Sequence, residues 1–322
     1  MAGNAPGNIT QFGLGNSTQF VLGETTRVAS LELLIPILLA VVSLLYSTAL
    51  PMFLQERARL RATPVATLVL WQALALGGVL AALGGGVLAV SLWLRPDVPT
   101  WIHFISALAA LLAGLVLIRL LVSGYRVGRR LRSIRKRYRD LVDLLGNSLD
   151  HAVVADIRVV ESTLPVAYCL PAWRSARIVL ASSALEHLSR DQLAAVLAHE
   201  RAHLIARHDL LLEAFAVLDR AFPRVMGGAI AAREVGILVE ILADRSACAA
   251  TSCRSLVEAM AILDEISATQ QEISVAFSAI PQRLANLRTT TGSRRGQALG
   301  IWAIAAVVFG LPVWLLVLWL IP

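Results

Sequence analysis

The sequence predicts an α-helical membrane protein in which four transmembrane helices carry a mainly helical aqueous domain with a small sheet. Of the 322 residues, 57% are hydrophobic and 16% are charged, and the mean hydropathy is +0.69. Soluble domains are about 45–50% apolar and about 25% charged, so the excess of apolar residues indicates lipid as a second solvent. This composition excludes a disordered or collagen-like chain. The charged residues gather mainly in one block, which predicts a separate aqueous domain.

Four stretches contain no Asp, Glu, Lys or Arg. They are Leu33–Gln55, Val65–Leu94, Val98–Ile118 and Gly296–Pro322. Each is longer than the roughly 20 residues that cross a hydrocarbon core of about 30 Å as a helix. We therefore predict transmembrane helices at about 33–55, 66–93, 101–121 and 297–321. The polar residues 1–30 predict a disordered exterior tail, with a cleaved signal peptide as a rival interpretation of the first stretch.

Basic residues predict the orientation of the chain. The first short loop carries Arg57, Arg59 and Arg61, and residues 126–139, the basic collar, hold eight basic residues and no acid. Because such loops stay in the cytoplasm, we expect both termini outside and the aqueous domain inside the cell. Outside the collar, residues 119–295 hold 16 basic and 18 acidic residues. The formal charge of +7 therefore indicates a collar beside anionic membrane lipids, not a nucleic-acid surface.

The aqueous domain, residues 124–295, begins with short β-type segments and continues as helices. Runs rich in Val, Ile and Ala predict two or three strands, at Val153–Val160, Pro165–Leu170 and Arg177–Ala181. Apolar spacings of three and four then predict a helix that begins after an N-cap, either Ser189 or Asp191. Further helices are predicted at Asp209–Phe222, Ala229–Ala250 and Ser255–Gln271.

The first of these helices contains the sequence His199-Glu200-Arg201-Ala202-His203, an HExxH motif. Histidines at i and i+4 lie one turn apart on one helix face, so both imidazoles can bind one Zn²⁺. Glu200, next to the first histidine, is then the candidate catalytic base that acts on a water molecule at the metal. Charged neighbours place the motif in water, which argues against an intramembrane protease. The alternative is a pair of histidines on an ordinary surface helix.

A third metal ligand is predicted in the helix over residues 229–250. Glu240 begins the run Glu240-Ile-Leu-Ala-Asp244, and a carboxylate would complete three protein ligands and leave a fourth position open for water. Asp244, one turn further on, can accept a hydrogen bond from a ligating histidine and fix its tautomer. Glu213 and Glu234 are competing carboxylates. The alternative is that Glu240 and Asp244 merely lie on the solvent-exposed side of a helix.

These motifs resemble those of the antirepressor membrane metallopeptidases of the BlaR and MecR type. The similar segments are residues 188–203, 207–209 and 240–244, with residues 70–74 and 280–284 similar to smaller members. The resemblance covers roughly residues 31–320. It implies a four-span protein with a cytoplasmic gluzincin-type zinc metallopeptidase domain before the last span.

The resemblance implies a zinc metalloendopeptidase that relays an envelope signal by cleaving a cytosolic protein, such as a winged-helix repressor of the BlaI type. The chain departs from the family pattern because Pro322 follows the last span directly, without a penicillin-binding sensor domain. Two alternatives stay open. One is a housekeeping metalloprotease for membrane-protein quality control, and the other is a non-enzymatic membrane scaffold with a vestigial zinc site.

Supporting residues are predicted with their roles left open. His208 and Arg283 are candidates to stabilise the transition state, and a structural salt bridge is the alternative for each. The strand at Arg177–Ala181 is a candidate to pair with an extended substrate as an added edge strand. The odd number of cysteines predicts no disulfide framework, a reducing compartment and thiols that act as buried small hydrophobes. These cysteines are Cys169, Cys248 and Cys253.

Overall fold

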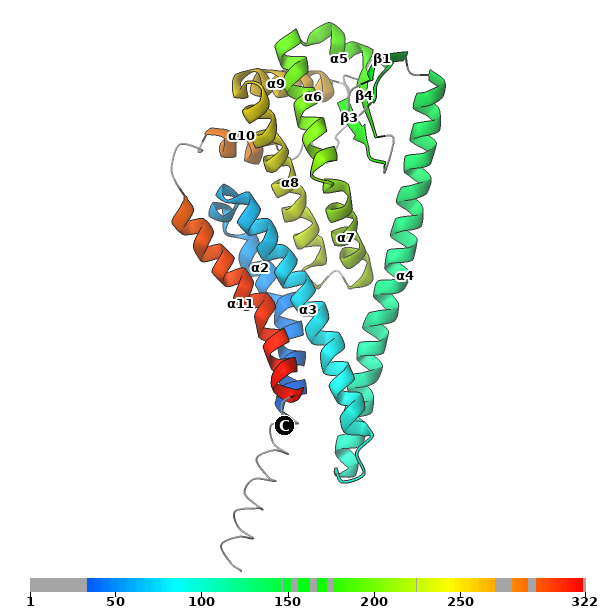
Figure 1. The fold of residues 1–322 in the computed structure, drawn as a ribbon, viewed down its shortest axis with the longest axis vertical. Coiled ribbons are helices and arrows are strands. Elements are labelled where there is room, and N and C mark those ends of the chain that lie inside the picture. The colour runs from blue at the N-terminus through cyan, green and yellow to red at the C-terminus, as the bar shows by residue number, and fades with distance from the viewer. Residues whose placement is uncertain are drawn as a thin grey trace, which may run out of the picture.

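The computed structural model describes residues 34–145, 147–151, 156–162, 167–172, 176–223, 225–269, 280–288 and 294–320. It is elongated, with long helices at one end and a head of shorter helices and a small sheet at the other (Figure 1). Four helices of the described part are long and apolar enough to cross a membrane, namely Leu34–Gln55, Pro64–Trp93 (α3), Thr100–Leu144 (within α4) and Arg295–Leu320 (α11). They cover the four predicted spans, and the term membrane helices refers below to these four apolar helices, defined by their length and composition alone. The predicted exterior tail, residues 1–30, lies outside the described residues.

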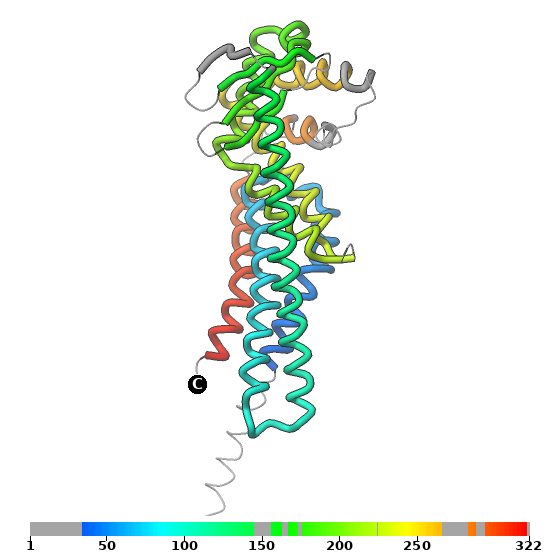
Figure 2. Tube along the Cα trace, turned by 90° about the vertical axis from the view of Figure 1, so that its right-hand side faces the viewer, coloured from blue at the N-terminus to red at the C-terminus, as the bar shows by residue number. Residues whose placement is uncertain are grey.

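The third membrane helix continues far beyond its expected end at residue 121. α4 runs from Thr100 to Leu145, a length of 46 residues that includes the whole basic collar. The arginine-rich collar contains no proline, and arginine has high helix propensity, so nothing in it ends the helix. Only 6% of the most apolar part of α4 is buried, compared with 39% in α3. α4 therefore meets α3 at the hairpin far from the head and then diverges from it (Figures 1 and 2).

The first membrane helix is interrupted by a proline. Helical residues 34–47 give way to a turn at residue 48 and to α2, Ala49–Gln55. Pro51 has no N–H group with which to bond the carbonyl of Ser47, four residues before it. The backbone N–H of Gly227, in the head, donates to this carbonyl at 2.6 Å. A proline in the membrane helix thus frees the acceptor to which the head is attached.

A second proline-freed carbonyl connects the first and last membrane helices. Pro312 lies inside α11, so the carbonyl of Val308 receives no bond from its own helix. The hydroxyl of Tyr46, in the first membrane helix, donates to that carbonyl at 2.9 Å in a buried position. Pro51 and Pro312 each free a carbonyl, and a donor from a neighbouring element bonds each of these carbonyls.

The head begins with a four-stranded sheet in the order β1-β2-β4-β3. Its strands are Asn147–His151 (β1), Asp156–Val160 (β2), Ala167–Leu170 (β3) and Arg177–Ala181 (β4). β2 and β4 are parallel, whereas the two outer pairs are antiparallel. Three strands lie within the predicted ranges. β1 is an additional strand that sequence patterns do not predict, because Asn, Asp and Ser, which strands disfavour, dominate its five residues.

The expectation that Arg177–Ala181 receives a substrate at the sheet edge is wrong. β4 lies between β2 and β3 and is hydrogen-bonded on both sides. Its last four residues, Ile178–Ala181, are buried, so the most apolar strand takes a central position. β3, not β4, forms this edge of the sheet.

Six helices complete the described part of the head. They are α5 (Ser182–His187), α6 (Arg190–Ile205), α7 (His208–Ala221), α8 (Gly228–Ala250), α9 (Cys253–Thr269) and α10 (Ile280–Arg288). A capping box begins α6, because the Ser189 hydroxyl accepts from the Gln192 N–H while the Gln192 side chain accepts from the Ser189 N–H. Ser189, and not Asp191, is therefore the N-cap. α6 to α9 correspond to the four predicted helices.

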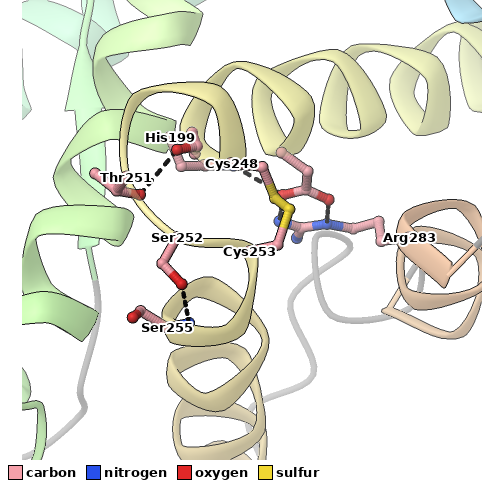
Figure 3. The surroundings of a disulfide bond; sticks show 9 residues. His199, Cys248, Thr251, Ser252, Cys253, Ser255 and Arg283 are labelled. Carbon is pink, nitrogen blue, oxygen red and sulfur yellow. Dashed lines mark hydrogen bonds and ion pairs between the residues drawn. A yellow bond between two sulfur atoms is a disulfide. The ribbon is translucent and has the colours of Figure 1, made fainter. Parts of the chain in front are cut away.

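The expectation of three free cysteines is wrong for one pair, because Cys248 and Cys253 form a disulfide. That expectation rests on the odd number of cysteines and on a spacing of five residues that suits no metal site. In the structure, α8 ends at Ala250, and Cys253 begins α9 after a turn, which brings the two Cα atoms to 4.4 Å. His199 and Arg283 are among the residues around this bond (Figure 3). Cys169 is a free cysteine.

Candidate metal centre

α6 presents His199 and His203 on one face, one helical turn apart. Their Nε2 atoms are 3.1 Å apart, and their side chains are only 10% and 13% exposed. Glu240 approaches the pair from α8. Its Oε2 lies 3.5 Å from Nε2 of His199, and its Oε1 lies 3.5 Å from Nε2 of His203. Two helices that are distant in sequence therefore bring together the three predicted ligands.

The three side chains fit a tetrahedral zinc site. Ligand atoms about 2.0–2.1 Å from a tetrahedral ion lie about 3.3–3.4 Å from one another. The distances of 3.1 and 3.5 Å between the histidine and carboxylate atoms bracket that value. One possible ligand atom from each residue lies within 4.8 Å of the other two. Two imidazoles and one carboxylate also match the ligand set of catalytic zinc, which leaves the fourth position open.

The two competing carboxylates lie in contacts elsewhere in the fold. Glu234 forms a salt bridge of 2.7 Å with Arg61, in the 3₁₀ helix η1 (Ala58–Ala62). Glu213 lies 3.4 Å from Nη1 of Arg135 in the basic collar. Both acids therefore attach the head to elements of the membrane part. Of the three carboxylates considered, Glu240 is the one that reaches both histidines.

Asp244 supports the cluster from one turn further along α8. Its side chain is 1% exposed, and its Oδ1 lies 3.0 Å from Nδ1 of His199, although the N–H direction departs from ideal hydrogen-bond geometry. This contact favours a proton on Nδ1 and leaves Nε2 free for a metal. Arg283, from α10, donates to both carboxylate oxygens of Asp244, at 2.8 and 2.6 Å.

Arg283 also lies 3.2 Å from Oε2 of Glu240. One guanidinium thus neutralises the buried Asp244 and the half-buried Glu240 of α8. The sequence presents Arg283 as a candidate transition-state stabiliser, with a structural salt bridge as the alternative. The contacts favour the structural role, because buried Asp and Glu side chains need a cationic partner. Burial raises the pKa of Asp244, but the bonds from Arg283 and His199 outweigh it and lower that pKa.

The two histidines differ in their pKa. Burial lowers the pKa of His199, but contacts with Asp244 and Glu240 outweigh it and raise that pKa to about 9. Burial and the neighbouring His199 lower the pKa of His203 to about 4. His203 therefore offers a lone pair at neutral pH, whereas a metal must displace one proton from His199.

Glu200 is half-buried beside this cluster, and Cys169 is its neighbour from β3. Burial raises the pKa of Glu200 to about 7, although His199 opposes the rise. Such a value suits a group that accepts and returns a proton near neutral pH. The Cys169 thiol is hydrogen-bonded to Glu200, and burial raises the pKa of the thiol, so it remains a donor. The sequence predicts only a small hydrophobe at this position, since no spacing relates β3 to the HExxH helix.

His208 lies at the start of α7, behind His203. The Nδ1 atoms of the two residues are 3.1 Å apart, and His208 is buried. Arg207, with φ of 51°, makes the sharp change of direction between α6 and α7 that brings His208 back to the cluster. Its position is that of a residue that orients the His203 ring, rather than one that forms a salt bridge.

Residues 129–280 match the model of peptidase family M48. The M48 match indicates a peptidase, a hydrolase of a generally metal-dependent and typically zinc-binding family. No curated protein and no solved structure matches the chain. The M48 region contains the HExxH motif, Glu240 and Asp244, and it extends from the basic collar to the first residue of α10.

Arg283 and the membrane helices other than α4 lie outside the M48 region. The contacts of Arg283 nevertheless make it part of the candidate metal centre, because it neutralises carboxylates of the matched region. The structure therefore adds one residue beyond the matched segment, and Cys169 within it, to the side chains that surround the candidate ligands.

Proposed function

We propose that this chain is a membrane-embedded zinc metalloendopeptidase with a cytoplasmic catalytic domain. The observation that carries the proposal is the convergence of His199, His203 and Glu240 beside Glu200, inside the region that matches peptidase family M48. The ligand set favours zinc over harder cations, which prefer sites built of oxygen alone.

The proposed reaction is the hydrolysis of a peptide bond. When bound, zinc supplies Lewis acidity that polarises a water molecule and the scissile carbonyl. Glu200 accepts the proton of the attacking water and later donates it to the leaving amine. Its pKa of about 7 suits both steps. Asp244 and Arg283 keep His199 and Glu240 oriented, because their contacts leave these ligands little freedom to turn.

The membrane position is supported by the four apolar helices and by the arrangement of the basic residues. The loop over residues 56–63 packs against the head, because the carbonyl of Arg61 accepts from Asn286 at 2.7 Å. This basic loop, the collar and the head therefore lie on one side of the apolar helices (Figure 1). The positive-inside rule then favours a cytoplasmic head, with both ends of the chain outside.

The disulfide offers a test of that orientation. The cytoplasm keeps most thiols reduced, so a cytoplasmic head predicts that the Cys248–Cys253 disulfide is reduced to two free thiols in growing cells. A membrane-permeant maleimide should then label the pair in intact cells, and an impermeant maleimide should not. A pair that resists the permeant reagent until a reductant is added would argue against a cytoplasmic head.

We propose a cytosolic protein as the substrate, with a winged-helix repressor of the BlaI type as the first candidate. The resemblance to the antirepressor peptidases supports this choice. β3 forms a sheet edge beside α6, and its Cys169 interacts with Glu200. An extended peptide that adds to this edge would therefore pass the proposed catalytic base.

The experiment compares the full-length wild type with Glu200→Gln, both purified in lipid nanodiscs and loaded with zinc. We expect the wild type to cleave the repressor at one or a few bonds and Glu200→Gln to retain zinc without cleaving. Cleavage of many unrelated proteins by the wild type would favour the housekeeping metalloprotease. Equal cleavage by both variants would refute the peptidase proposal and leave the scaffold.

A further inference from the structure

A continuous apolar groove runs between the membrane helices on the side of α4. One cavity of about 470 Å³ lies between the first membrane helix, α3 and α4. A smaller cavity of about 130 Å³ lies between these helices and the segment that joins α7 to α8. Both are lined by Ser43, Ser47, Ala82, Val116 and Met226. The two cavities are therefore adjoining parts of one space.

The groove exists because α4 leaves the membrane helices to pack on the head. α3 and α4 touch at Gly86 and Ala113, where a Cβ added to the glycine would collide with the alanine. Nearer the head, the hydroxyl of Ser123 in α4 donates to the carbonyl of Val217 in α7 at 2.8 Å. α4 thus follows α7 and separates from α3 (Figure 1), and small side chains leave the space between them open.

A basic pocket of about 700 Å³ borders this groove at its head end, between α4 and the end of α7. Arg119, Arg126 and Arg220 line it, and no carboxylate is among its described lining residues. Within the described part of the chain, none of these arginines forms a salt bridge. Phe222 lines both the basic pocket and the smaller cavity, so the arginines of the pocket lie next to the apolar end of the groove.

We propose that the groove and the basic pocket together bind one anionic phospholipid. Its phosphate lies against the three arginines, and an acyl chain extends along α4 from Val116 toward Trp101. These residues are roughly 22 Å apart at 1.5 Å per helical residue, which exceeds the ~15 Å half-thickness of the hydrocarbon core. The groove is therefore long enough to hold an acyl chain that crosses one leaflet, with the arginines at the depth of the headgroups.

Charge complementarity selects this occupant over other apolar ligands. Three unpaired arginines attract an anionic headgroup far more strongly than a zwitterionic one, which carries its own positive charge. A transmembrane helix of another protein would fill part of the groove and leave the arginines without a partner. The lipid proposal rests on the membrane position in the proposed function and is independent of the peptidase activity.

The test compares two triple variants of the full chain in nanodiscs of phosphatidylcholine with and without phosphatidylglycerol. The pocket variant is Arg119→Gln, Arg126→Gln and Arg220→Gln, and the control variant is Arg129→Gln, Arg130→Gln and Arg137→Gln. Native mass spectrometry counts the bound phosphatidylglycerol. We expect one tightly bound lipid on the wild type, a roughly 100-fold weaker affinity for the pocket variant, and less than about a 5-fold loss for the control. Equal losses would indicate general surface attraction and overturn the site.

A second pair of variants tests the groove without changing charge. Ser43→Leu with Ala82→Leu fills the groove, whereas Ala303→Leu makes one of these changes, Ala to Leu, on an exposed face of α11. The groove variant should bind phosphatidylglycerol about tenfold more weakly, and the control should not change. Glycerol phosphate should compete poorly, because it lacks the acyl chain. Competition equal to that of the full lipid, or binding unaffected by the filled groove, would show a simple anion pocket and overturn the proposal.

Two further measurements distinguish failure of this proposal from failure of the proposed function. Alkaline carbonate extraction reports whether the chain is an integral membrane protein. If it is, and the wild type still retains no phosphatidylglycerol, the lipid site alone is wrong. Glu200→Gln should keep the lipid, since Glu200 lies in the head. Release of the wild type by carbonate would overturn the membrane position and the lipid site together.

Discussion

The metal centre and the junction between the head and the membrane helices lie along the same helix, α8, but they are stabilised by opposite means. At the metal centre, Glu240 and Asp244 depend on charged partners that neutralise them. At the junction, Gly227 and Gly228 depend on the absence of a side chain, because an added Cβ would meet Pro51 or the backbone of Asp219. The metal centre should therefore fail when atoms are removed, and the junction when atoms are added.

Removal of the third ligand should have the largest effect. Glu240→Ala leaves two histidines, which hold zinc far more weakly than three ligands, so zinc affinity should fall by more than about 100-fold. Glu213→Ala is the matched control, because Glu213 pairs with Arg135 and not with the histidines. The zinc stoichiometry that remains after competition with a chelator measures zinc binding in the two variants. Normal zinc in Glu240→Ala and its loss in Glu213→Ala would reverse the assignment.

Removal of the cation that supports the ligands should come next. Arg283→Met leaves Asp244 and Glu240 buried without their positive partner, which costs about 3–5 kcal/mol of stability in zinc-free protein. Bound zinc should recover part of this loss, because it partners Glu240. Thermal unfolding with and without chelator measures the difference. Arg254→Met, which breaks an exposed pair with Glu258, should leave the midpoint unchanged.

The junction should respond to the opposite change. Gly227→Ala places a Cβ against the Pro51 ring and should destabilise by about 1–3 kcal/mol. Gly236→Ala, in the interior of the helix that Gly227 caps, has open space around the added atom and should stabilise by about 0.5–1 kcal/mol. Thermal unfolding of the two variants tests the sign. Equal effects would mean that helix propensity alone, and not contact with the membrane helix, governs both glycines.

The two regions also differ in how far sequence alone predicts them. The HExxH spacing, the carboxylate pair on the next helix and the apolar lengths are local patterns, and they predict the ligands and the four membrane helices. Arg283 and Cys169 join the metal centre through long-range packing of α10 and β3, which no spacing encodes. The central place of β4 and the disulfide likewise depend on strand order and on the turn after Ala250.

Sequence patterns also fail to predict that α4 continues from residue 121 to Leu145, and the reason is again physical. A run of charged residues indicates where lipid contact ends, but helical hydrogen bonds do not depend on side-chain charge. The helix therefore continues from the apolar stretch into the basic collar without a break. Sequence patterns place the boundary of the membrane, whereas the boundary of the helix follows from its packing on α7.

The last prediction concerns the proline-freed carbonyl of Val308. Tyr46→Phe removes its donor in a buried position and should cost about 1–3 kcal/mol. Pro312→Ala supplies an N–H that can bond the same carbonyl within α11, so Tyr46→Phe in that background should cost close to nothing. A double-mutant cycle by thermal unfolding isolates the coupling, with exposed Tyr125→Phe as control. If Tyr46→Phe costs the same in both backgrounds, the hydroxyl stabilises something other than the freed carbonyl.

The carbonyl of Ser47 is also freed by a proline, but its donor is the backbone N–H of Gly227, which no side-chain substitution removes. The hydrogen bond between the two membrane helices can therefore be removed by a side-chain substitution at Tyr46. The hydrogen bond to the head can be disturbed only by an added side chain at Gly227.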